Sequence, residues 1–173
     1  MLAELVAGLI ALAEVQGGVP RDSPPATPPI PPLPEGRLLL FAGNGFGANF
    51  LALDQTSKSG SEVDAWVFTV PAQPYNLMGH NPDRRVAQYL RHLTFDCARR
   101  GTYVELSEDA FNEAGQRVVW LPAESPQPIE PRSTEDFLAK VMCDGQNPPD
   151  SNIVIGHSAA VRVAHLILSP PQT

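Results

Sequence analysis

The chain has 173 residues, of which 43% are apolar and 18% charged, and its formal net charge is −7. This length and composition indicate one globular domain, large enough to bury a core. The acidic balance argues against a nucleic-acid partner, because binding to a phosphate backbone depends on Lys and Arg.

The first stretch of the chain is apolar. Leu5, Leu9 and Leu12 lie at helical spacing within residues 2–15 and would form one stripe of a helix. The stretch lacks the basic segment that precedes the apolar part of a signal peptide, and it is too short to cross a bilayer. We therefore predict an N-terminal docking helix over residues 1–18 and no membrane span.

A proline-rich stretch follows. Residues 20–34 contain eight prolines, which hold the backbone extended and keep it out of a sheet interior. Pro31 and Pro34 also have the PxxP spacing of peptides that bind aromatic grooves. We predict a stiff proline-rich linker over residues 19–36, and a protein partner that binds the chain through residues 1–34.

Residues 37–173 are expected to form a single α/β domain. Three uninterrupted apolar runs have the composition of strands buried in a parallel sheet: Leu38–Phe41, Ala65–Val70 and Ile153–Ile155. Weaker strand signals stand at Tyr103–Leu106 and Val118–Leu121. Because glycine turns follow the first and the last of the apolar runs, we expect these two strands to be parallel neighbours.

A helix is predicted after residue 82. Asp83 is suited to cap its N-terminus. Val86, Leu90 and Leu93 then follow at the spacing of one helical stripe. His92 would lie on the exposed side of this helix.

Two further helices are predicted in the last third of the chain. Ser133 and Asp136 have capping-box spacing in front of a helix that ends at Gly145. Another helix begins near Ser158 and is apolar on most sides, with the Ser158 hydroxyl as its expected N-cap. The predicted fold class is therefore α/β, a mostly parallel sheet with helices on both faces, plus the N-terminal helix and the proline-rich arm.

The two cysteines, Cys97 and Cys143, lie far apart in the chain and show no spacing typical of a zinc site or a disulfide framework. We predict two free thiols and hence an intracellular, reducing compartment. The glycines between residues 43 and 47 have neither dinucleotide-binding nor P-loop spacing, so no cofactor is predicted. The cysteine spacing likewise predicts no metal.

The best candidate site follows the strand at Ile153–Ile155. His157 and Ser158 stand at its C-terminal end, where ligands of open α/β sheets usually bind. Gly156-His157-Ser158-Ala159-Ala160 resembles the nucleophile elbow of α/β-hydrolases. That resemblance implies Ser158 as nucleophile. His165 is about 10 Å along the helix from Ser158, so only His80 or His92 could supply a base.

The same resemblance gives a role to the glycine-rich turn after the first strand. Gly43, Asn44, Gly45 and Gly47 stand where α/β-hydrolases keep their oxyanion donors. An alternative is that the glycines only allow the turn itself.

A second resemblance is to the histidine phosphatases, the phosphoglycerate-mutase-like superfamily. Ser133–Val141 and Asn152–Arg162 resemble the end of that fold, which implies His157 as the second site histidine and Arg162 as an anion-binding residue. The segment from residue 37 to 41 resembles its first strand, but Ala42-Gly43-Asn44 replaces the Arg-His-Gly that carries the nucleophile. The resemblance therefore implies the fold without the phosphoryl transfer.

A third resemblance is to SMI1/KNR4-type domains, which bind proteins. The segments from 41 to 47 and from 50 to 54 carry it. Together these patterns favour a non-catalytic protein with an enzyme-like fold that acts through protein–protein binding, as an accessory subunit of a larger assembly. The alternatives are a serine hydrolase that uses Ser158 and a phosphoryl hydrolase that uses His157.

Overall fold

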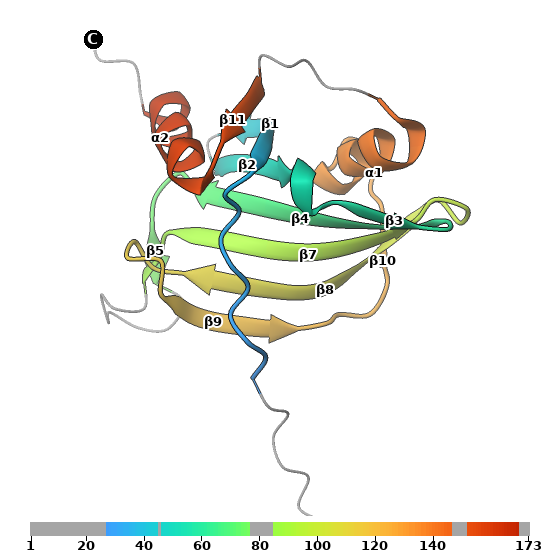
Figure 1. The fold of residues 1–173 in the computed structure, drawn as a ribbon, viewed down its shortest axis with the longest axis horizontal. Helices are drawn as coiled ribbons and strands as arrows, with labels where there is room; N and C mark the ends of the chain where they lie inside the picture. Colours follow the sequence, from blue (N-terminus) through green and yellow to red (C-terminus); the bar gives the residue numbers. More distant parts are fainter. Residues whose placement is uncertain (1–26, 45, 77–84, 147–151, 170–173) are drawn as a thin grey trace, which may run out of the picture.

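The computed structural model describes residues 27–44, 46–76, 85–146 and 152–169 (Figure 1). The predicted helix over residues 1–18 and His80 lie outside the described residues. The division into a docking helix, a linker over residues 19–36 and a domain over residues 37–173 stays a prediction.

A nine-stranded antiparallel sheet dominates the fold. Its strands are β1 (Arg37–Asn44), β2 (Gly47–Ala52), β3 (Ser57–Ser59), β4 (Glu62–Pro71), β7 (Gln88–Asp96), β8 (Thr102–Phe111), β9 (Arg117–Pro122), β10 (Gln127–Pro128) and β11 (Ile153–Ile155). The order is β10-β8-β7-β4-β2-β1-β11, with β3 paired to β4 and β9 paired to β8. The remaining elements are a 3-10 turn (Leu53–Gln55), the β5 (Tyr75–Asn76) and β6 (Arg85–Val86) hairpin, α1 (Thr134–Asp144) and α2 (His157–Leu168).

The predicted parallel α/β fold is wrong. Strands β1 and β11 are neighbours, as expected, but they run antiparallel, with Leu38 opposite Val154. Short turns join most successive strands, and strands joined in that way pair antiparallel. The predicted strands themselves are confirmed, because β1, β4, β8, β9 and β11 cover the five sequence runs.

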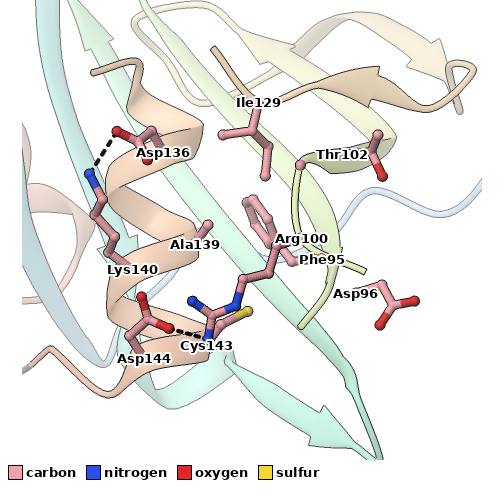
Figure 2. Close-up of a pocket in the computed structure, with 11 residues that line it drawn as sticks. Phe95, Asp96, Arg100, Thr102, Ile129, Asp136, Ala139, Lys140, Cys143 and Asp144 are labelled. Carbon is pink, nitrogen blue, oxygen red and sulfur yellow. Dashed lines mark hydrogen bonds and ion pairs between the residues drawn. The ribbon is translucent and has the colours of Figure 1, made fainter. Parts of the chain in front are cut away.

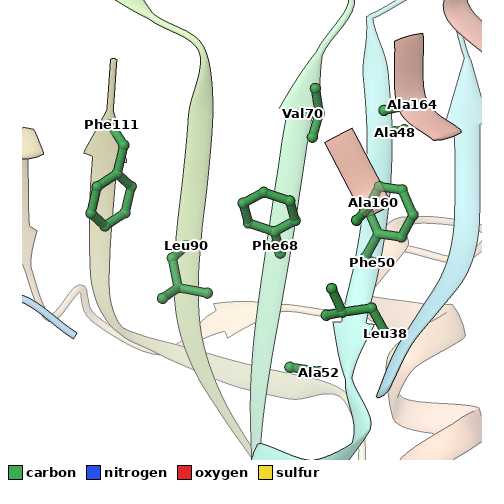
Figure 3. Packing of buried hydrophobic residues seen from close by; sticks show 10 residues of the cluster. All are labelled: Leu38, Ala48, Phe50, Ala52, Phe68, Val70, Leu90, Phe111, Ala160 and Ala164. Carbon is green, nitrogen blue, oxygen red and sulfur yellow. The ribbon is translucent and has the colours of Figure 1, made fainter. Parts of the chain in front are cut away.

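One face of the sheet packs against α2, and we call it the α2 face. Its core residues are Leu38, Ala48, Phe50, Ala52, Phe68, Val70, Leu90 and Phe111, with Ala160 and Ala164 from α2 (Figure 3). All of these residues are buried. Elsewhere on this face, Trp66 stacks on His92 at a ring distance of 4.2 Å.

The proline-rich segment from residue 27 to 36 also crosses the α2 face, and we call it the strap (Figure 1). Arg117 fixes it by donating from Nη2 to the Pro28 carbonyl at 2.8 Å, while its Nη1 pairs with the buried Asp109 at 2.9 Å. Leu33 packs against the core cluster and Pro34 is buried. The strap thus takes the place of a further layer over strands that α2 is too short to cover.

The opposite face packs against α1, and we call it the α1 face. Its core residues are Leu39, Leu51, Ala65, Val67, Leu93 and Phe95, with Leu138 from the helix. Ser133 caps α1 by accepting a hydrogen bond from the Asp136 N–H at 3.1 Å. Gly145 ends the helix in the left-handed conformation, with φ at 66°. Both predicted ends of this helix are confirmed.

The predicted helix after residue 82 is wrong, because residues 88–96 form strand β7. Leu90 and Leu93 would share a face on a helix, but on the strand they point to opposite faces. Leu90 lies in the core beneath α2 and Leu93 in the core beneath α1. A strand that is buried on both faces can therefore have apolar residues at the spacing expected of a helix.

Two predictions about α2 are also wrong. The helix is not buried on most sides, since Leu166 is 77% exposed. Its N-cap is Gly156, without a side-chain capping bond, so Ser158 does not have the predicted capping role. Gly156, with φ at 78°, turns the chain directly after β11 and so sets where the helix begins.

The predicted free thiols are wrong as well. Cys97 and Cys143 form a disulfide with their Cα atoms 5.3 Å apart. Cys97 follows the end of β7 and Cys143 lies in the last turn of α1. Their approach depends on the packing of α1 on the sheet, which no spacing in the sequence indicates.

Candidate functional site

The predicted pair His157 and Ser158 begins α2 and lies beside the strap. His157 Nδ1 is 2.7 Å from Glu35 Oε1, and Ser158 Oγ is 3.4 Å from His157 Nε2. The Glu35 side chain is 75% exposed and Ser158 is exposed, so water reaches the whole group. Sequence reasoning missed Glu35 because it belongs to the proline-rich segment.

The predicted anion-binding residues are spread over two elements. Gly43 and Gly47 belong to the β1–β2 hairpin, and a Cβ on Gly47 would stand 2.8 Å from the Val70 carbonyl oxygen. Asn44 pairs with Gly47 across this hairpin, Gly45 lies outside the described residues, and Arg162 is exposed on α2. Close packing accounts for Gly47, and a role of these residues in anion binding stays a prediction.

The other candidate histidine, His92, lies on strand β7 instead of a helix surface. Its ring is stacked on Trp66, and its Nε2 is 3.8 Å from Asp64 Oδ1. Burial is the main cause that lowers the pKa of His92. Among the residues that the structure describes, no group of three or more His, Cys, Asp or Glu side chains is placed to hold a metal ion.

A hollow of about 210 Å³ opens beside the disulfide, and we call it the disulfide cleft (Figure 2). Helix α1 forms one wall. The end of β7, the turn between β7 and β8, the start of β8 and Ile129, which follows β10, form the other. Its lining residues are Phe95, Asp96, Arg100, Gly101, Thr102, Ile129, Asp136, Ala139, Lys140, Cys143 and Asp144. Phe95 is 2% exposed and belongs to the core of the α1 face. The bottom of the cleft is therefore continuous with the hydrophobic core.

The rim of the disulfide cleft is charged, and its cations are paired. Lys140 Nζ contacts Asp136 Oδ2 at 2.8 Å, and Arg100 pairs with Asp144 (Figure 2). The hydrogen bond from Lys140 lowers the pKa of Asp136. In each pair the two opposite charges neutralise each other. The cleft therefore has an apolar interior and a rim of paired charges.

The sequence model of the family described as Surface-adhesin protein E matches residues 39–144. The match covers more than half of the chain. This protein belongs to the surface-adhesin protein E family. No curated protein and no solved structure matches the chain at a significant level.

This family membership corrects the resemblances drawn from short motifs. The resemblance to histidine phosphatases is wrong, as are those to α/β-hydrolases and SMI1/KNR4 domains. The predicted accessory subunit with an enzyme-like fold is wrong too, and so are its hydrolase and phosphatase alternatives. An adhesin binds other molecules, and that part of the partner prediction holds.

The predicted intracellular location is also wrong. A surface-adhesin family indicates a protein exposed outside the cell, where a disulfide persists. No described helix is long and apolar enough to span a membrane. The disulfide cleft lies wholly inside the matched residues, whereas His157, Ser158 and Arg162 lie beyond them.

Proposed function

We propose that this protein is an extracellular surface adhesin that attaches to a partner protein through the disulfide cleft. The observation that carries the proposal is the cleft itself. It is an apolar hollow within a frame of paired charges, and the Cys97–Cys143 bond fixes one end of it.

The volume of the cleft favours a protein partner over a free small molecule. Pockets that enclose small molecules usually measure about 300–1,000 Å³. The cleft, at about 210 Å³, is smaller. Strong protein interfaces commonly place one large side chain in a hollow of the partner and surround it with polar contacts. The cleft has the size and the polarity for such an anchor.

The charges at the rim favour an apolar anchor. Lys140 and Arg100 each have a carboxylate partner. A charged group that entered would have to compete with these pairs. An apolar side chain would only displace water from the partly exposed Ile129 and Ala139. We therefore propose an aromatic or aliphatic anchor residue on the partner.

A contact through residues 1–34 was the expectation from the sequence. From residue 28 onward the strap is bound to its own sheet, through Pro28, Leu33 and Pro34. This part of the arm is less available to a partner than the disulfide cleft is.

The test uses attachment to cells. Beads coated with the purified protein are applied to a cell layer, with and without soluble protein as competitor. We expect saturable attachment that soluble protein inhibits and that protease treatment of the cell layer removes. Attachment no higher than that of albumin-coated beads would refute the adhesin role, and attachment that survives the protease would refute a protein partner.

Two variants locate the contact. Thr102→Trp places a large ring at the exposed edge of the disulfide cleft, and Glu113→Trp places the same ring in the exposed turn after β8. We expect Thr102→Trp to lower attachment at least about tenfold, which corresponds to 1.4 kcal/mol, and Glu113→Trp to leave it unchanged. If the two variants changed attachment equally, the contact would not lie at the disulfide cleft.

A further inference from the structure

A second hollow lies on the α1 face, and we call it the polar hollow. It measures about 320 Å³ and is open to solvent. Thr69, Tyr89 and Arg91 reach it from strands β4 and β7, and Glu105 and Glu108 reach it from β8. These residues, like those that line the disulfide cleft, all lie within the part of the chain that the family model matches.

Among the described residues in and beside the polar hollow, carboxylates outnumber cations. Arg91 Nη2 contacts Glu105 at 2.7 Å, and Arg91 Nη1 contacts Glu135 of α1 at 3.1 Å. Glu108 is 4.0 Å from Arg91 Nε, and it makes no shorter ion pair within the described part of the chain. One guanidinium thus faces three carboxylates. Glu108 is the carboxylate whose charge is least compensated.

Glu108 is held in a setting that is unfavourable to its own charge. Its side chain is 24% exposed. Burial, and then the nearby Glu105, raise the pKa of Glu108. A cation that entered the polar hollow would offset both effects by its charge, since it would stand beside the carboxylate that lacks a close partner.

Two tyrosines provide an independent observation. The rings of Tyr75 and Tyr89 have centroids 5.9 Å apart, and both rings line the polar hollow. The Tyr89 hydroxyl oxygen is buried and has no hydrogen-bond partner among the described residues. A buried hydroxyl without a partner is unfavourable, and aromatic faces attract cations within about 6 Å.

We infer that the polar hollow binds the cationic end of a basic side chain of the partner protein, with Glu108 as its ion-pair partner and the face of Tyr75 beside it. The ammonium of Lys and the guanidinium of Arg share this chemistry. The inference rests on the proposed function only where it assigns the cation to a partner protein, since small cations test the site by themselves.

The first experiment is a titration of the full chain, followed by NMR. The probes are n-butylammonium and n-propylguanidinium, with 1-butanol as the uncharged control. We expect saturable, millimolar binding of both cations that weakens as salt is added, and no binding of butanol. Preference for either cation supports the inference and names the basic side chain. Absence of saturable cation binding would overturn it.

Variants then locate the site. Glu108→Gln removes the carboxylate and keeps its shape, and Glu113→Gln makes the same change in an exposed turn. We expect the first to weaken cation binding about tenfold and the second by less than about twofold. Tyr75→Leu, in the exposed hairpin, should weaken binding severalfold. Equal losses in Glu108→Gln and Glu113→Gln would mean that only the net charge matters, and would overturn the site.

The bead assay separates this inference from the proposed function. If small cations bind but beads do not attach, the site stands and the adhesin role fails. If beads attach while small cations fail to bind, the adhesin role stands and the polar hollow is overturned.

Discussion

The two faces of the sheet differ in how they are covered. The α2 face is closed by α2 and the strap over a continuous apolar cluster. The α1 face carries the disulfide cleft, the polar hollow and the Arg91 ion pairs. The family match covers both hollows and leaves out the strap and α2. The α1 face is therefore the one on which we propose binding, although each face also holds part of the core.

The largest expected effect concerns the disulfide, which ties α1 to the sheet. Cys97 and Cys143 are 46 residues apart. For a loop of this length the chain-entropy argument predicts that Cys97→Ala with Cys143→Ala lowers the free energy of unfolding by about 4 kcal/mol. Urea denaturation measures it. A reductant should destabilise the native chain and leave the double variant unaffected. A loss under about 1 kcal/mol would mean that packing alone holds α1.

The next effect compares the two helices. Leu138 of α1 is completely buried, whereas Leu166 of α2 is 77% exposed. Leu138→Ala should therefore lower the free energy of unfolding by about 2–5 kcal/mol. Leu166→Ala should change it by less than about 0.5 kcal/mol. Thermal denaturation of both variants gives the difference. Similar losses would show that α2 buries its outer side against something else.

A smaller effect on stability is expected from the N-terminal caps of the two helices. Ser133 caps α1 through the Asp136 N–H, while α2 begins at Gly156 without a side-chain cap. Ser133→Ala should lower the free energy of unfolding by about 1 kcal/mol. Ser158→Ala, the matched change at the start of α2, should have almost no effect. A loss of about 1 kcal/mol in Ser158→Ala would restore the capping role that the sequence predicts.

Local signals predicted the elements better than their arrangement. The capping box at Ser133 and the stop at Gly145 act within one helix, so the sequence alone identifies them. Runs such as residues 38–41 and 153–155 identify strands in the same way. The direction of pairing does not follow from such runs, because an antiparallel sheet covered on both faces also buries both sides of its strands.

The wrong prediction of a helix after residue 82 has the same cause, burial on both faces of the sheet. Leu90 and Leu93 fit a helical stripe only because the α2 face buries one and the α1 face buries the other. A sheet exposed on one side would have shown polar residues at alternate positions and so revealed the strand.

The candidate sites needed the tertiary structure for a different reason. The disulfide cleft combines strand β7, the β7–β8 turn, the residue after β10 and α1, which are dispersed over about 50 residues of sequence. No motif joins Cys97 to Cys143 or Glu108 to Tyr75. By contrast, His157 and Ser158 are adjacent and form a visible motif, yet they lie outside the matched family region.

The smallest expected effect tests whether Glu108 on the α1 face lowers the free energy of unfolding. Because burial raises the pKa of Glu108 in the folded chain, the folded state holds its proton more tightly than the unfolded state does. Stability contributed by this proton is present below the unfolded pKa and is lost as the pH rises through the raised pKa. Above that range Glu108 destabilises the fold.

Glu108→Gln should therefore stabilise the protein at pH 7, by less than about 1 kcal/mol, since the side chain is still partly exposed. The gain should shrink as the pH is lowered and vanish near pH 4, below the usual pKa of a glutamate, about 4.3. Urea denaturation between pH 4 and pH 8 measures this difference, with Glu113→Gln expected to show none. A Glu108→Gln variant less stable than the native chain at pH 7 would mean that Glu108 supports the fold through Arg91. The Arg91–Glu108 contact would then be a structural ion pair. The inference needs the opposite, a carboxylate that destabilises the fold and that an external cation can therefore stabilise.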